Sequence, residues 1–173
     1  MKNYIILFFC ILFSSSVIAQ TKADEPAYKK DSNIPDFTIL QADSTWFSKA
    51  DLPKGKYDYT FIVYFSPDCG HCQQEATGIV KKMDSLKNVF FVFVAYKSLE
   101  EVKGFASYYA LDKFPNVRIG RDPKYFVPTF YRVTRVPFLA VYNKAGILEK
   151  VFDPAITDVP DAAGLIEYIN QKH

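Results

Sequence analysis

The chain has 173 residues, of which 49% are hydrophobic and 17% aromatic, and this is enough apolar side chain for the core of one domain. The formal net charge is +2, with 21 basic and 19 acidic residues. This near balance of basic and acidic residues gives no reason to expect nucleic acid or an anionic membrane surface as a partner.

The first residues predict an export signal. A short basic start precedes the apolar run Tyr4–Phe13, which has the length of a signal-peptide hydrophobic region and is too short to cross a bilayer. Cleavage is expected after Ala19, which gives a signal peptide of residues 1–19 and a periplasmic protein. The alternative is an uncleaved anchor facing the periplasm, and membrane association is expected only in that case. Cys10 follows the bulky Phe9, unlike the cysteine of a lipoprotein signal, and is taken as signal sequence.

Residues 20–33 are polar and rich in lysine, with one proline at Pro26. This composition is typical of a flexible leader. The folded domain is therefore expected over residues 34–173. At its start, Phe37–Leu40 and Trp46–Phe47 predict an N-terminal β-hairpin.

A buried strand followed by a helix comes next. Tyr59–Phe65 is a continuous run of β-branched and aromatic residues, typical of a central parallel strand. Beyond Ser66-Pro67-Asp68, apolar residues recur at helical spacing on one face. The members of that face are Cys72, Ala76, Ile79, Val80, Met83 and Leu86.

The remaining pattern alternates in the same way. Val89–Ala95 predicts a second buried strand, and the capping box that joins Ser98 to Glu101 begins a helix. A short extended piece at Val117–Ile119 and a short helix through Phe130 follow. The last elements are a strand at Val136–Tyr142, a returning strand at Ile147–Phe152 and a helix capped by Asp161. The order predicts an α/β fold in which helices flank a central mixed sheet.

The chemistry is expected at Cys69-Gly70-His71-Cys72, where the strand ends and the helix begins. The free N–H groups and the dipole of a helix N-terminus stabilise a thiolate at Cys69, and the thiolate is the form that attacks a disulfide. Cys72 lies one turn further on and can resolve the mixed disulfide. No cofactor is expected beyond this redox-active pair. An inert disulfide or two buried thiols is the structural alternative.

The histidine in the motif has two interpretations. An imidazolium at His71 would stabilise the Cys69 thiolate and make the disulfide a better oxidant; alternatively, His71 is a solvated side chain. No metal site is expected, because a structural zinc site needs two more ligands than the cysteine pair supplies.

The segment Phe65–Glu75 resembles the active-site segment of thioredoxin-like proteins, in particular the exported TlpA/ResA-like thiol–disulfide oxidoreductases, with a dipeptide like that of disulfide isomerases. The resemblance implies a thioredoxin-like fold with an extra N-terminal hairpin. It also implies that Pro137 is cis beside the cysteines, that the Val136 backbone pairs with substrate, and that Glu75 moves protons to or from Cys72. The alternatives without a functional role are that Pro137 is an ordinary proline at the start of a strand and that Glu75 is a surface glutamate.

Three departures from the family pattern bear on these expectations. Asp68 replaces the usual tryptophan, and an acid there opposes thiolate formation at Cys69. Val63 stands where thioredoxins carry a buried aspartate. The long stretch Leu99–Arg135 is rich in aromatic residues and arginine. Gly70 and Asp68 are expected to contact substrate together with Val136.

The leading hypothesis is disulfide exchange with exported proteins, in which a membrane redox protein resets the cysteine pair; the net direction is open. One alternative is a peroxiredoxin-like peroxidase, although Ile62 stands where that motif needs proline. The other is a non-enzymatic copper- or metal-handling module, for which the sequence offers only the terminal His173 as a distant histidine.

Overall fold

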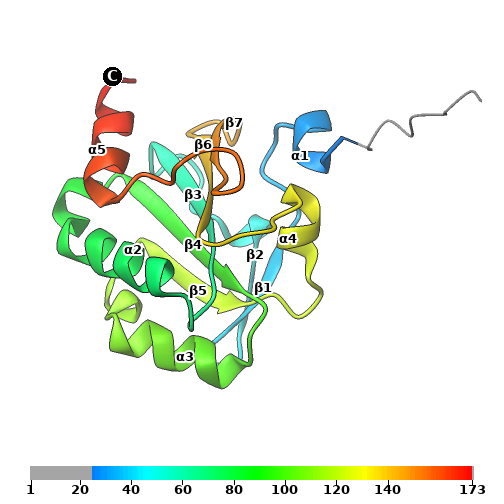
Figure 1. Ribbon diagram of the computed structural model, residues 1–173, viewed down its shortest axis with the longest axis vertical. Coiled ribbons are helices and arrows are strands. Elements are labelled where there is room, and N and C mark those ends of the chain that lie inside the picture. Colours follow the sequence, from blue (N-terminus) through cyan, green and yellow to red (C-terminus); the bar gives the residue numbers. More distant parts are fainter. Residues whose placement is uncertain (1–24, 173) are drawn as a thin grey trace, which may run out of the picture.

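The computed structural model describes residues 25–172, so the expected export signal lies outside the described residues (Figure 1). The elements, apart from short 3-10 turns, are α1 (Ala27–Lys30), β1 (Thr38–Gln41), β2 (Trp46–Ser48), β3 (Tyr59–Tyr64), α2 (Gly70–Lys81), β4 (Val89–Ala95), α3 (Leu99–Tyr108), β5 (Val117–Arg121), α4 (Phe126–Tyr131), β6 (Phe138–Asn143), β7 (Leu148–Phe152) and α5 (Ala162–Asn170).

The strands form one seven-stranded mixed sheet in the order β2-β1-β5-β4-β3-β6-β7. β3, β4 and β5 are parallel neighbours. On one side, β6 pairs antiparallel with β3, and β7 pairs antiparallel with β6. On the other side, β1 pairs antiparallel with β5, and β2 pairs antiparallel with β1. The predicted α/β class and the N-terminal hairpin are therefore confirmed. Because β3 is an interior strand with β4 and β6 on either side, the loop that follows it emerges within the sheet edge and not at its end.

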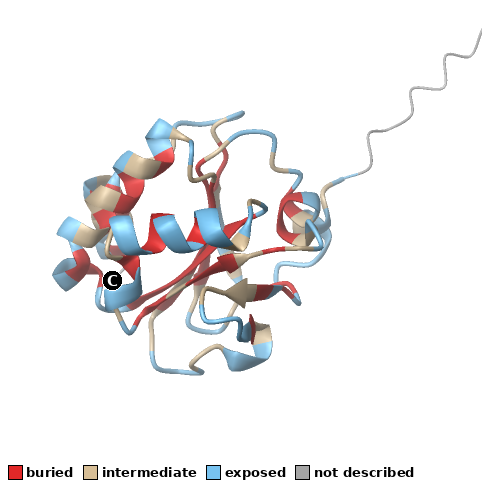
Figure 2. Cartoon of the chain, turned by 90° about the horizontal axis from the view of Figure 1, so that it is seen from below, coloured by how far each residue is buried: buried red, intermediate tan, exposed pale blue. Residues whose placement is uncertain are grey.

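Two apolar cores cover the two faces of the sheet, and successive residues of β3 serve them alternately. Phe61 and Val63 face the core under α2, α3 and α5, whereas Ile62 and Tyr64 face the core under α1 and α4. β4 is buried along its whole length, as Figure 2 shows for the central strands. This double burial explains why β3 and β4 read as unbroken apolar runs instead of alternating ones.

The helix ends largely follow the predicted caps. Ser98 and Glu101 form the expected capping box at the start of α3, and Asp161 accepts a hydrogen bond from the Gly164 N–H at the start of α5. α2 ends earlier than its apolar pattern predicted, at Lys81, and the buried residues beyond it sit on a 3-10 turn, Met83–Leu86. The spacing of apolar residues could not separate these two helix types.

The boundary of the expected flexible leader needs correction. α1 contains Tyr28, whose ring lies 5.7 Å from that of Tyr131 on α4. Asn33 forms an isolated antiparallel bridge with Ile147. The ordered part therefore begins well before Ile34, because an aromatic side chain and the backbone of the polar segment find partners on the domain that its composition does not reveal.

Candidate active site

Cys69 caps the helix that follows the central strand. It is the N-cap residue of α2, and its Sγ accepts a hydrogen bond from the Cys72 N–H at 3.3 Å. This contact and the dipole of α2 both favour negative charge on the sulfur. Cys69 is only half-buried, so it is more open to a second molecule than the buried Cys72. The strand–motif–helix arrangement is the one that the sequence predicted.

Cys72 lies in a different environment. It is 2% exposed, and burial, followed by a hydrogen bond with Cys69, raises the pKa of its thiol well above the ordinary value. Both cysteines are thiols in this structure. The pair is therefore asymmetric: Cys69 is half-buried at the helix N-terminus, whereas Cys72 is buried and its thiol has a raised pKa.

The loop before β6 closes over the pair. The peptide bond between Val136 and Pro137 is cis, and the Cys69 Sγ lies 3.7 Å from the Val136 carbonyl oxygen, within reach for a weak S–H···O contact. Pro137 is buried and Val136 is half-buried. Val136 and Pro137, which the resemblance placed beside the cysteines, thus lie next to them although they are far away in the sequence.

Glu75 is a buried carboxyl group on the same helix. It is 7% exposed, and its Oε1 is buried with no hydrogen-bond partner among the described residues. Burial, followed by the negative charge of Asp161, raises the pKa of Glu75 to about 7. A carboxyl group with this pKa can both take up and release a proton at neutral pH.

Asp68 does not stand as an unpaired charge beside Cys69. It accepts a short hydrogen bond from the Ser66 hydroxyl and a 2.9 Å contact from the Lys97 ammonium group. These two partners, Ser66 first, lower the pKa of Asp68 to about 2. Lys97 therefore offsets part of the negative charge with which Asp68 was expected to oppose the Cys69 thiolate. The sequence analysis missed this lysine because it comes from the loop after β4.

The other predicted residues lie at the surface of the motif. His71 is exposed, in keeping with either interpretation of its role. Gly70 is the first residue of α2, and a Cβ atom built there would meet nothing within 4 Å.

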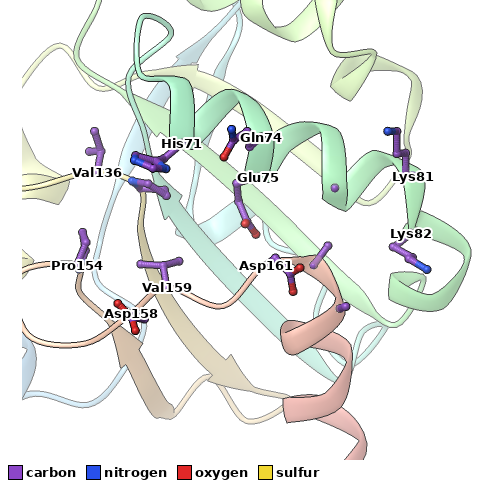
Figure 3. Close-up of a pocket in the computed structure, with 14 residues that line it drawn as sticks. His71, Gln74, Glu75, Lys81, Lys82, Val136, Pro154, Asp158, Val159 and Asp161 are labelled. Atoms are coloured by element: carbon purple, nitrogen blue, oxygen red, sulfur yellow. The ribbon is translucent and has the colours of Figure 1, made fainter.

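A groove runs beside the motif between α2 and the segment that leads into α5. Its volume is about 690 Å³, and Figure 3 shows Glu75 reaching into it from α2 toward Asp161 on the opposite wall. The sequence predicted Asp161 as a helix cap but gave no sign that it faces Glu75, because that proximity depends on how α5 packs against α2. The lining residues are His71, Gln74, Glu75, Gly78, Lys81, Lys82, Val136, Pro137, Pro154, Asp158, Val159, Asp161, Ala162 and Ala163.

Residues 25–172 contain neither a metal-ligand cluster nor a membrane-spanning helix. No cluster of three or more His, Cys, Asp or Glu side chains is arranged to hold a metal ion there. Within the same range, no helix combines the length and apolarity needed to cross a bilayer.

The fold and the site define a thioredoxin-like α/β protein with a cysteine pair at a helix N-terminus beside a cis-proline loop. No family model matches the chain. The chain is 25% identical over 167 residues to the protein disulfide isomerase-like 1-1 of Arabidopsis thaliana, a match that covers 95% of this chain and 30% of that relative. The chain thus spans less than a third of the length of this curated relative.

Solved structures show the same fold. A secreted disulfide oxidoreductase of Mycobacterium tuberculosis, homologous to E. coli DsbE, aligns with a TM-score of 0.64 at 20% identity and covers 79% of this chain and 96% of that one. A peroxiredoxin-like protein of Aquifex aeolicus aligns with a TM-score of 0.63 at 17% identity, covering 81% and 85%. Both classes share this fold, so the fold alone does not distinguish an oxidoreductase from a peroxiredoxin.

Proposed function

We propose that the protein is a thiol–disulfide oxidoreductase that exchanges disulfides with exported proteins through Cys69 and Cys72. The observation that carries the proposal is the asymmetry of the pair. Cys69 is half-buried at a helix N-terminus with its Sγ beside the Val136 carbonyl, whereas Cys72 is buried. The Cys69 sulfur is thus suited to attack another molecule, whereas the Cys72 sulfur is suited to attack only the Cys69 sulfur.

In the reductive direction, the Cys69 thiolate attacks one sulfur of a substrate disulfide. The substrate S–S bond breaks, a mixed disulfide with Cys69 forms, and the departing substrate thiolate takes up a proton. The Cys72 thiol then loses its proton and attacks the Cys69 sulfur, which releases the second substrate thiolate. Two electrons pass from the protein to the substrate, and the Cys69–Cys72 disulfide remains. The oxidative direction reverses each step.

Glu75 is proposed as the group that accepts the Cys72 proton. The Cys72 thiol has a raised pKa and is buried away from solvent base, so its attack needs a proton acceptor inside the protein. Glu75 lies three residues further along the same helix, the spacing at which two side chains share a helix face. Its pKa of about 7 leaves a large fraction ionised at neutral pH.

His71 and the Val136–Pro137 loop have supporting roles in the proposal. An imidazolium at the exposed position 71 favours the reduced pair and raises the reduction potential. Pro137 has no N–H because its nitrogen is part of the ring, and the neighbouring backbone at Val136 is proposed to make a strand-like contact with a substrate segment. Gly70 and Asp68 border the approach to Cys69 and are proposed as further substrate contacts.

The setting of the reaction is proposed from the N-terminal sequence, with a periplasmic location after cleavage or as a membrane-anchored form. The solved structure from M. tuberculosis belongs to a secreted oxidoreductase, which supports export by analogy. The partners are protein thiols and disulfides and a membrane redox protein that resets the pair. No other cofactor is proposed.

Trapping tests the two cysteine roles. In the Cys72→Ser variant the mixed disulfide cannot be resolved, so disulfide-linked substrates should accumulate on Cys69 and can be identified by mass spectrometry. The Cys69→Ser variant is the matched control and should trap almost nothing. Trapping by Cys69→Ser in place of Cys72→Ser would reverse the assignment, and trapping by neither would remove the proposed activity.

The direction is tested by the reduction potential measured against glutathione. A value near −270 mV indicates a reductant of the thioredoxin type, and a value near −120 mV indicates a strong oxidant. Consumption of hydrogen peroxide by the reduced protein at catalytic rates would instead favour the peroxiredoxin alternative. Stoichiometric copper binding without disulfide reductase activity would favour the metal-handling alternative.

A further inference from the structure

The groove beside the cysteine pair has an uneven charge distribution. Three carboxyl groups, those of Glu75, Asp158 and Asp161, lie in its middle and on the wall opposite α2, whereas the ammonium groups of Lys81 and Lys82 lie at the end far from His71 (Figure 3). A groove with separated charges of opposite sign favours an occupant with complementary charges in the same order.

The floor of the groove contains an unsatisfied group. Glu75 is more than nine-tenths buried, reaches into the groove, and has one oxygen without a hydrogen-bond partner in the described part of the chain. A buried acceptor without a partner costs free energy. Asp161 adds a second negative charge across the groove. A cationic donor between the two carboxyl groups would satisfy Glu75 and relieve their repulsion.

Resting on the proposed disulfide exchange, we propose that this groove binds the substrate segment that flanks the reactive cysteine and selects a basic side chain two positions from that cysteine. The spacing follows from the geometry of α2. The substrate cysteine bonds to Cys69, the N-cap of α2, and Glu75 lies six residues further on, about 9 Å along the helix. Two residues of an extended chain span about 7 Å and place their side chains on the same face, and the length of a lysine or arginine side chain covers the remaining distance.

The walls suit a long basic side chain. Pro154, Val159 and Ala162 line the groove and offer apolar surface to the methylene groups of a lysine or arginine, while the charged end reaches the carboxyl groups. Asp158 and Asp161 are exposed at the rim, where they can attract a cation before contact. Lys81 and Lys82 at the far end favour an acidic residue further from the substrate cysteine.

The test uses short peptides whose single cysteine is joined by a disulfide to thionitrobenzoate. Attack by the Cys69 thiolate on the peptide sulfur forms the Cys69–peptide disulfide and releases coloured thionitrobenzoate, so the second-order rate constant is read directly. The peptides carry arginine, leucine or glutamate two positions before or after the cysteine. In at least one of the two placements, the arginine peptide should react about fivefold faster than the glutamate peptide at low salt, and 0.5 M NaCl should reduce the difference.

Matched variants separate the groove from the rest of the surface. The double variant Asp158→Asn/Asp161→Asn keeps an acceptor oxygen at position 161 for the helix cap, removes two charges, and should cut the difference between peptides to less than about twofold. The control Asp84→Asn/Asp112→Asn removes two exposed charges outside the groove and should leave the difference unchanged.

Two outcomes overturn the proposal in distinguishable ways. Equal rates for all peptides, together with rapid reaction of a capped single cysteine–thionitrobenzoate disulfide, would refute the groove selectivity and leave the exchange activity intact. A reduced protein that reacts with the capped disulfide no faster than free cysteine would refute the proposed activity itself, and the selectivity with it. A preference that survives unchanged in Asp158→Asn/Asp161→Asn would also remove the groove from the explanation.

Discussion

Glu75 on α2 and Asp161 at the start of α5 face each other across the groove beside the cysteine pair, and the charge of Asp161 adds to burial in raising the pKa of Glu75 to about 7. Two carboxyl groups that share one site cannot both ionise freely. The protonation of Glu75 therefore changes with pH near neutrality. This relationship connects the proposed proton transfer from Cys72 with the stability of the fold.

The first prediction concerns that stability. The pKa of Glu75 is higher in the folded protein than the ordinary value of 4.5, so the folded state holds the proton more tightly. The stability from this protonation is complete below about pH 4.5 and is lost as pH rises through about 7. Glu75→Gln should remove a fall of about 3 kcal/mol in the free energy of unfolding between pH 5 and pH 8. Denaturant unfolding of both proteins at the two pH values measures the difference, and parallel pH profiles would contradict it.

The second prediction concerns the ion pair beside the motif. Asp68→Asn removes a negative charge near Cys69, so the rate of reaction with a small disulfide at pH 7 should rise about twofold to threefold. Lys97→Met leaves Asp68 without its cationic partner and should lower the same rate by a similar factor. The rate of 5,5′-dithiobis(2-nitrobenzoate) reduction provides the measurement. Changes in the same direction for both variants would argue against an electrostatic origin.

The third prediction concerns the unequal reactivity of the two thiols. Cys69 is half-buried at a helix N-terminus, and Cys72 is buried with a raised pKa. Iodoacetamide at pH 7 should therefore modify Cys69 more than about tenfold faster than Cys72. Peptide mapping by mass spectrometry after timed alkylation distinguishes the two sites, and unfolding the protein first should remove the difference.

The fourth prediction concerns the packing of the N-terminal hairpin. A Cβ at Gly120 on β5 would lie 2.8 Å from the Leu40 carbonyl oxygen and 3.1 Å from the Ile39 side chain. Gly120→Ala should therefore destabilise the protein by about 1–3 kcal/mol. Gly104 on α3 is the matched control, because a Cβ there meets nothing within 4 Å. Gly104→Ala should stabilise the helix by about 0.5–1 kcal/mol. Denaturation midpoints of the two variants should move in opposite directions.

Much of the fold follows from local sequence. The unbroken apolar runs of β3 and β4, the capping box at Ser98 and the cap at Asp161 each specify an element through interactions among neighbouring residues. The boundaries of the elements and of the domain were less well determined by local sequence. The change from α-helix to 3-10 turn after Lys81 and the docking of Tyr28 against Tyr131 depend on distant packing.

The sequence by itself determined that two cysteines stand where a central buried strand meets a helix, and this rests on backbone periodicity and on the helix N-terminus. Tertiary structure alone decided which side chains surround them. The contact of Cys69 with the Val136 carbonyl, the pairing of Asp68 with Lys97 and the opposition of Glu75 and Asp161 each join segments far apart in the chain. Such pairs form because the sheet and the helices that pack on it bring loop ends together, and periodicity within a segment carries no information about them.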